Sequence, residues 1–271
     1  GGKNMTADTF YPILMVHGMG FRDRRRLCYW GRIPGVLEEN GARVCFGGQD
    51  GGGSVESNAA QLRSRLNQVL AETGAEKVNI IAHSKGGLEA RYLISSMGCG
   101  GKVASLTTLS TPHNGSLTVD KLMRIPIPVV KFGCKAADLW FRLMGDKSPD
   151  TFSAINMFKT TSAEKFNIEN PDDPQVYYQS FGFVMKGFTS DIAMCLPWLV
   201  VHAVEGDNDG LLAPRAVTWT NFMGVYKGGG RRGISHCDEV DLRRRRMDVS
   251  GEGDITDFYL HIVSDLKKKG F

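Results

Sequence analysis

The sequence predicts an α/β fold in which helices cover both faces of a mostly parallel sheet. Short apolar runs alternate with longer stretches whose apolar residues recur at helical spacing, and this alternation is typical of parallel sheets. The chain has 271 residues, of which 42% are hydrophobic and 23% charged, so it can bury a substantial core. We expect one domain over residues 1–271, because the pattern shows neither an internal repeat nor a linker.

Four strands are predicted in the first half of the chain. They are residues 11–16, 44–46, 78–82 and 103–109, which are apolar runs of the kind found in strands buried on both faces. A helix is predicted between the second and third of them, because Ser54 can cap it and Gly74 can end it. Another helix, over 86–97, separates the third and fourth strands and ends at Gly98.

The second half of the chain is less regular. Pro126, Pro128 and Pro149 interrupt short apolar stretches within 117–174, and we interpret this region as a helical insertion. It is either a lid over a substrate pocket or an ordinary helical layer over the sheet. Strands are predicted again at 176–181 and 198–204, and residues 255–268 carry the apolar stripe of a terminal amphipathic helix.

Composition and charge exclude several classes of partner. The longest apolar run, 192–204, is interrupted by Pro197 and His202 and is too short to span a bilayer. The formal net charge of +4 is small, and no aromatic residues interleave with the basic clusters, so no nucleic-acid partner is expected. An anionic lipid or micelle surface suits such clusters better. They are residues 22–26, 231–232, 243–246 and 267–269.

The strongest local signal is a serine at the corner between a strand and a helix, in the sequence Val-Asn-Ile-Ile-Ala-His-Ser-Lys-Gly-Gly of residues 78–87. A nucleophile elbow turns so sharply that the residues two before and two after the serine must be small. Ala82 and Gly86 meet this requirement. The alternative is that Ser84 only caps the helix, because serine is common at that position.

A serine hydroxyl becomes a nucleophile when a base takes its proton and an acid orients that base. His236 lies in a glycine-flanked polar loop late in the chain, whereas His202 falls within the predicted strand 198–204 and is expected in the core. Asp207 and Asp209 follow that strand and both qualify as the acid. The order serine, aspartate, histidine is the order used by α/β-hydrolases.

Several blocks of the chain resemble bacterial lipases of the α/β-hydrolase superfamily. Residues 11–20 resemble the opening strand and oxyanion loop of these lipases, and 81–87 resemble their alanine-type elbow. Residues 111–116 resemble the loop after the next strand, 208–212 the acid loop, and 235–240 the histidine loop. The resemblance implies an α/β-hydrolase fold.

The resemblance also implies a role for each matching residue. Ser84 would be the nucleophile, His236 the general base and acid, and Asp209, which directly precedes a glycine, the residue that orients His236. The backbone NH groups of Met19 and Lys85 would form the oxyanion hole.

Many lipases of this group hold a structural calcium ion, and Asp238 stands where the resemblance places one ligand, two residues after His236. Asp191 is a candidate for the second carboxylate, although no motif surrounds it, and Leu242 lies near the place where a glutamine is usual. Calcium requires six to eight oxygen ligands, so one carboxylate is a weak basis for a site. We therefore expect an enzyme that requires no cofactor, with structural calcium as the alternative.

Taken together, these features favour a serine-dependent carboxylic ester hydrolase. A triacylglycerol lipase or a carboxylesterase that acts on ester or lipid substrates, in some cases at a lipid–water interface, fits best. An acyltransferase or thioesterase with the same triad is one alternative, and a non-catalytic binding protein with this fold is another. The sequence indicates no particular cellular compartment.

Overall fold

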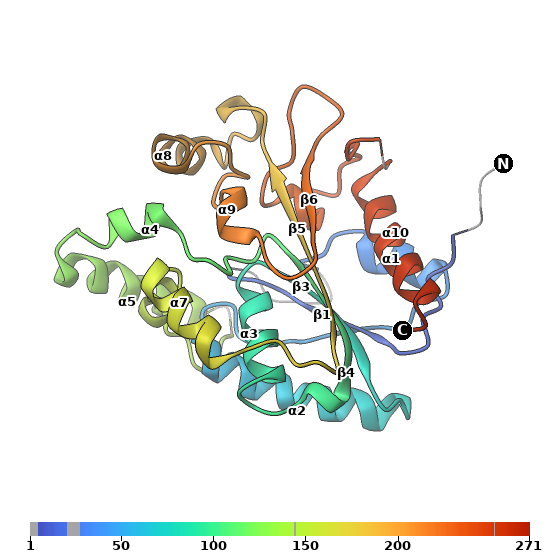
Figure 1. The fold of residues 1–271 in the computed structure, drawn as a ribbon. Coiled ribbons are helices and arrows are strands. Elements are labelled where there is room, and N and C mark those ends of the chain that lie inside the picture. Colours follow the sequence, from blue (N-terminus) through green and yellow to red (C-terminus); the bar gives the residue numbers. More distant parts are fainter. Residues whose placement is uncertain (1–4, 21–27, 144, 252) are drawn as a thin grey trace.

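A parallel sheet forms the centre of the protein (Figure 1). The computed structural model describes residues 5–20, 28–143, 145–251 and 253–271. Within these residues, six strands lie in the order β2-β1-β3-β4-β5-β6, and each neighbouring pair is parallel. The predicted fold class is confirmed.

The strands are β1 (Ile13–Val16), β2 (Val44–Phe46), β3 (Val78–His83), β4 (Val103–Leu109), β5 (Tyr177–Val184) and β6 (Phe222–Lys227). The longer helices are α1 (Ile33–Glu39), α2 (Val55–Thr73), α3 (Lys85–Ile94), α5 (Ile127–Leu143), α7 (Thr160–Glu169), α8 (Cys195–Glu205) and α10 (Ile255–Lys268). Shorter helices are α4 (Leu117–Leu122), α6 (Thr151–Asn156) and α9 (Pro214–Val217), with 3-10 turns at Gly100–Lys102, Phe188–Ser190 and Asp238–Val240.

Strand β1 separates two hydrophobic cores. Its side chains alternate, so that Ile13 and Met15 pack with apolar residues of α1 and α10, whereas Leu14 and Val16 pack with those of α2 and α3. Successive strand residues point to opposite faces of a sheet, and both faces of β1 are buried. Helices therefore cover the sheet on both sides, with α1 and α10 on one face and α2 and α3 on the other (Figure 1).

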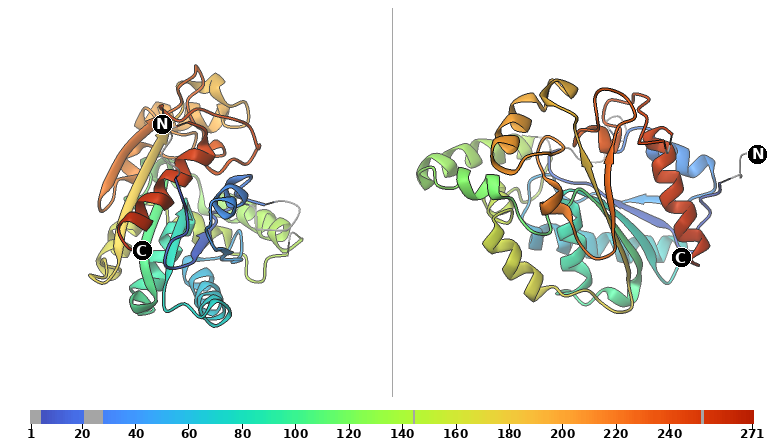
Figure 2. Two further views of the ribbon diagram at one scale, coloured as in Figure 1. Left: turned by 90° about the vertical axis from the view of Figure 1, so that its right-hand side faces the viewer. Right: turned by 45° about the horizontal axis from the view of Figure 1, so that its top comes forward.

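The region 117–174 contains helices α4 to α7, which lie on the opposite side of the molecule from α10 (Figure 2). Helix α5 exposes Phe132, Leu139, Trp140 and Leu143, each with at least 60% of its surface accessible. These positions recur at helical spacing and form one exposed apolar face. No helix in the described residues is both long enough and apolar enough to cross a membrane.

The predicted strand at 198–204 is wrong, because these residues belong to helix α8. Trp198 and Val201 are buried while Leu199 and Val200 are exposed, which is a helical pattern concealed within a continuous apolar run. His202 is exposed and stacks on Trp198 with ring centroids 4.3 Å apart, so its expected place in the core is also wrong. The last strand of the sheet is instead β6, which the sequence reading missed.

Candidate active site

Ser84 occupies the corner between β3 and α3 in a strained conformation. Its φ is 52° and its ψ is −133°, a combination that is rare for residues other than glycine and costs about 1–3 kcal/mol. Neighbouring groups hold this backbone in place. The Ser84 NH donates to the Leu109 carbonyl at 2.9 Å, and the Thr111 hydroxyl donates to the Ser84 carbonyl at 2.7 Å. The side chain of Ser84 makes no capping hydrogen bond to α3, so the simple N-cap interpretation is wrong.

The small residues around Ser84 are required by close backbone approach. A Cβ atom on Gly86 would lie 2.4 Å from the carbonyl oxygen of His17 and 2.8 Å from that of Val16. A Cβ on Gly18 would lie 2.9 Å from the Cβ of Ser84. The end of β1 and the start of α3 therefore meet at Ser84, as a nucleophile elbow requires.

The two residues expected to form the oxyanion hole flank this meeting point. Lys85 is the first residue of α3, so its NH belongs to the free first turn of a helix. Met19 follows Gly18, which lies against Ser84. The ring of His17 lies between two carbonyl groups, with Nδ1 2.7 Å from the Gly18 oxygen and Nε2 2.9 Å from the Gln49 oxygen, and so fixes the loop that carries Met19.

His236 and Asp209 form a buried pair. His236 Nδ1 lies 2.7 Å from Asp209 Oδ2, and the backbone NH of His236 donates to the Asp209 carbonyl at 2.7 Å. The other carboxylate oxygen, Oδ1, accepts from the NH groups of Leu211 and Leu212 at 3.0 and 2.8 Å. Burial raises the pKa of Asp209, but the charge and hydrogen bond of His236 outweigh it and hold the pKa well below its usual value. Asp207, the other candidate acid, is exposed.

The acid loop reaches this place by a route that the sequence did not reveal. It follows helix α8, not a strand, yet the NH of Met185 at the end of β5 donates to the Asn208 carbonyl at 2.8 Å. This bond fastens the loop to the carboxyl edge of the sheet, where parallel α/β proteins place their functional loops.

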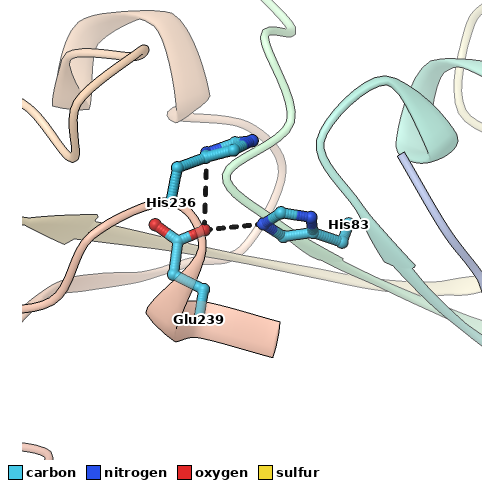
Figure 3. Close-up of side chains that lie close together, drawn as sticks. All are labelled: His83, His236 and Glu239. Atoms are coloured by element: carbon cyan, nitrogen blue, oxygen red, sulfur yellow. Dashed lines mark hydrogen bonds and ion pairs between the residues drawn. The ribbon is translucent and has the colours of Figure 1, made fainter. Parts of the chain in front are cut away.

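Glu239, His83 and Tyr29 form a second layer beneath His236 that sequence reasoning missed. Figure 3 shows the Glu239 carboxyl group beside both imidazole rings. Its Oε2 lies 2.7 Å from His83 Nε2 and 3.6 Å from His236 Nδ1. The Tyr29 hydroxyl lies 2.6 Å from His83 Nδ1, and the rings of His83 and His236 are 4.5 Å apart. Because His83 directly precedes Ser84, this contact brings the serine corner and the histidine loop together.

The charge states of this layer follow from its burial. Burial raises the pKa of Glu239 well above its usual value, and the neighbouring Asp209 carboxylate raises it further. Burial lowers the pKa of His83 well below its usual value, and the nearby His236 lowers it further. These shifts favour the neutral forms of Glu239 and His83, whereas the lowered pKa of Asp209 favours its ionised form beside His236.

The trio His83, His236 and Glu239 places three ligand atoms within 4.8 Å of one another, but it does not fit a metal ion. His83 Nε2 and Glu239 Oε2 are only 2.7 Å apart, whereas two ligand atoms about 2.0 Å from a tetrahedral ion lie roughly 3.3 Å apart. The trio is a hydrogen-bonded cluster.

An apolar pocket opens beside Ser84. Its volume is about 130 Å³, and its lining comprises Ser84, Pro112, Ser116, Val119, Phe158, Leu211 and Leu212. The two leucines belong to the acid loop, whereas Val119 comes from α4. The pocket therefore connects the serine to the helical region 117–174.

Asp191 and Asp238, the two carboxylates considered for calcium, lie close together but face a different cation. Arg243 Nη1 lies 2.7 Å from Asp191 Oδ2 and 3.2 Å from Asp238 Oδ1. The guanidinium group fills the space between the carboxylates. These residues, as arranged, do not fit a calcium ion.

The fold is similar to that of a solved esterase structure. A carboxyl esterase from a metagenome has a similar structure, with a TM-score of 0.73 and 12% identity over 97% of this chain and 77% of that one. An identity this low shows the fold alone. Together with the nucleophile-elbow geometry, it defines the chain as an α/β-hydrolase.

Sequence comparison identifies the family. The palmitoyl protein thioesterase family matches residues 12–171. Triacylglycerol lipase 2 of Saccharomyces cerevisiae is 30% identical over 90% of this chain and 74% of its own length. A triacylglycerol lipase of Vibrio cholerae is 40% identical over 86% of this chain and 80% of its own length. The chain belongs to the palmitoyl protein thioesterase family and is a lipase or esterase of the α/β-hydrolase superfamily, so the predicted class of carboxylic ester hydrolase is confirmed.

Proposed function

We propose that Ser84, His236 and Asp209 are the catalytic triad of this ester hydrolase. The observation that carries the proposal is the 2.7 Å contact between His236 Nδ1 and the ionised Asp209, formed where His236 packs against the residue preceding Ser84. Asp209 fixes the tautomer of His236, which leaves Nε2 as the base. The backbone NH groups of Met19 and Lys85 then serve as the oxyanion hole.

The reaction follows from these positions. Ser84 Oγ attacks the ester carbonyl while His236 Nε2 takes its proton, and the NH groups of Met19 and Lys85 stabilise the negative charge on the carbonyl oxygen. His236 returns the proton to the leaving alcohol as the carbon–oxygen bond breaks, which leaves an acyl group on Ser84. Water, deprotonated by His236, then releases the acid and restores the serine.

We infer that the substrate is a lipid ester with an acyl chain in the pocket beside Ser84. Its lining is mainly aliphatic and aromatic, and each methylene buried there contributes about 0.8 kcal/mol. The two relatives named above are triacylglycerol lipases. The family also carries the name of a thioesterase, which keeps thioester hydrolysis as the second candidate. The ratio of kcat/KM on an ester and a thioester with the same acyl chain decides between them.

The triad is tested with Ser84→Ala and, as a control, Ser64→Ala at an exposed serine on α2. We expect the first variant to lose hydrolysis of p-nitrophenyl butyrate by roughly a millionfold and to resist labelling by a fluorophosphonate. The control should keep both properties. Wild-type hydrolysis by Ser84→Ala would overturn the proposal, and failure of the wild-type protein to react with either reagent would favour a binding protein.

We further propose that the apolar face of α5 contacts a lipid–water interface and acts as a lid. A soluble protein rarely exposes four large apolar side chains on one helix without a partner. Two of the basic clusters noted in the sequence also meet, where the exposed Arg231, Arg232, Arg245 and Arg246 line a pocket of about 300 Å³ together with Asp238 and Asp248. Their positive charge favours an interface that contains anionic lipid.

Vesicle binding tests the interface. A Phe132→Ser/Trp140→Ser variant should bind vesicles more weakly than the wild type, whereas Arg142→Ser, at an exposed polar position of the same helix, tests for a simple effect of charge. Vesicles of phosphatidylcholine with and without phosphatidylglycerol separate the apolar from the electrostatic contribution. Equal binding by the wild type and the double variant would refute a role for α5.

A further inference from the structure

Arg243 forms a buried junction beside the histidine loop that the proposed reaction does not use. Its two terminal nitrogens each lie 2.7 Å from one oxygen of Asp191, and Nη1 also lies 3.2 Å from Asp238 Oδ1. The two aspartates are almost fully buried, with 1% and 7% of their surface exposed, whereas the Arg243 side chain is 30% exposed. A planar guanidinium that binds a carboxylate through two parallel hydrogen bonds is a strong and directional contact.

Ser235 connects this junction to His236, the next residue in the chain. The Ser235 hydroxyl donates to Asp191 Oδ2 at 2.6 Å, and its NH donates to Asp238 Oδ2 at 3.1 Å. The same hydroxyl accepts from the NH of Asp238 at 3.2 Å. The turn at Asp191 is thus fastened to the histidine loop, 44 positions further along the chain, and to the adjoining turn that carries Arg243.

All four carboxylate oxygens of the junction face hydrogen-bond donors. Asp191 Oδ1 accepts from Arg243 and from the NH of Ala193 at 3.0 Å, and Oδ2 accepts from Arg243 and Ser235. Asp238 directs one oxygen at Arg243 and the other at the NH of Ser235. A calcium ion needs six to eight oxygens with lone pairs directed at it, and it would have to displace these donors.

We propose that Arg243 is a built-in cation that holds the histidine loop at the place where the resemblance to bacterial lipases predicts calcium. A guanidinium group remains charged at any pH at which the protein is folded, and a chelator cannot remove it. The histidine loop is therefore fixed without a metal ion. The inference concerns the stability of the loop and does not depend on the reaction assigned to the triad.

Calcium measurements on the wild-type protein are the first test. Its melting temperature should be the same in 5 mM EDTA as in 5 mM CaCl₂, and titration calorimetry should detect no calcium binding tighter than the millimolar range. A lower melting temperature in EDTA, or one calcium ion bound with micromolar affinity, would overturn the proposal.

Substitution of the arginine is the second test. Arg243→Gln leaves two buried carboxylates without a cation, so its melting temperature should fall by about 5–10 °C, and Arg243→Lys should fall between it and the wild type. Arg246→Gln, at an exposed arginine in the same turn, is the matched control and should melt like the wild type. If Arg243→Gln also melts like the wild type, Arg243 does not hold the loop. The wild-type measurements decide the question of calcium even if Arg243→Gln does not fold.

Discussion

Gly86 provides the sharpest test of the elbow, because a single methyl group there would collide with backbone. The Cβ of Gly86→Ala would lie 2.4 Å from the His17 carbonyl oxygen, about 1 Å closer than the 3.4 Å at which ordinary contacts begin. Both atoms that it approaches most closely are main-chain oxygens of β1 and the following residue, so no side chain can rotate away. The strand end and helix α3 must separate instead.

This separation should have two measurable effects. Overpacking of this kind costs about 1–3 kcal/mol, which corresponds to a fall of roughly 3–9 °C in the melting temperature for a chain of this size. The His17 carbonyl also accepts a hydrogen bond from Gln49 at 2.8 Å and is followed by the loop to Met19. Displacing that loop by nearly 1 Å should lower kcat/KM about a hundredfold. The change in KM should be smaller than the change in kcat/KM.

Calorimetry and ester hydrolysis by purified Gly86→Ala measure the two effects. Gly35→Ala is the matched control, because Gly35 also lies in a helix and a Cβ there would meet no atom within 4 Å. The control should be as stable as the wild type or gain up to about 1 kcal/mol, since alanine favours helices. If Gly86→Ala keeps both the wild-type melting temperature and the wild-type kcat/KM, the close approach of β1 and α3 is not what requires a small residue.

Two further predictions concern the carboxyl groups near His236. Asp209→Asn should lower kcat by about 10⁴-fold because the amide favours the wrong tautomer of His236. Asp207→Asn, at an exposed site, should match the wild type in the same ester assay. If the two variants lose activity equally, Asp209 is not the residue that orients His236. The raised pKa of Glu239 means that the folded protein keeps a proton that the unfolded chain releases above its usual pKa of 4.5, so this group lowers stability as the pH rises. Glu239→Gln removes that penalty, and its melting temperature should gain on the wild type between pH 5 and pH 8; a difference that does not change with pH would contradict the neutral carboxyl.

The elbow could be predicted because its determinants are local. Ala82, Ser84 and Gly86 lie within five residues, and the sharp turn that they form needs only the strand before it and the helix after it. The five strands of the sheet that were predicted are likewise rich in apolar or β-branched residues, and all of them except the half-buried β2 are almost fully buried. In these segments the residue pattern and the tertiary structure agree, so local reasoning was sufficient.

The secondary-structure predictions fail in segments where apolar residues are exposed. Helix α8 exposes Leu196, Leu199 and Val200, so its apolar run hides the helical period. Strand β6 lies at the edge of the sheet, and its residues alternate between partial burial and exposure. Its only signal was the alternation within a six-residue segment that contains Gly224, and glycine weakens a strand pattern.

The second layer of the site could not be derived from spacing alone. Glu239 follows His236 by three residues, and His83 directly precedes Ser84, so both were visible as polar neighbours of candidate residues. What makes them relevant is that Glu239 and His83, separated by 156 positions, meet in full burial at 2.7 Å. That contact depends on how the histidine loop packs against the end of β3, which no local pattern encodes.

The proposed acid lies in a loop whose structural setting was predicted only in part. The predicted strand at 198–204 made both Asp207 and Asp209 candidates, and the resemblance to lipases favoured Asp209. The segment before them is helix α8, and the bond from Met185 to Asn208 returns the chain to the end of β5. The rule that functional loops lie at the carboxyl edge of a parallel sheet therefore holds for β5, with α8 inserted before its loop. The insertion also connects the acid to the pocket. Glu205, at the end of α8, accepts a hydrogen bond from Thr118 of α4 at 2.7 Å, so a movement of α4 would act on the segment that carries Asp209.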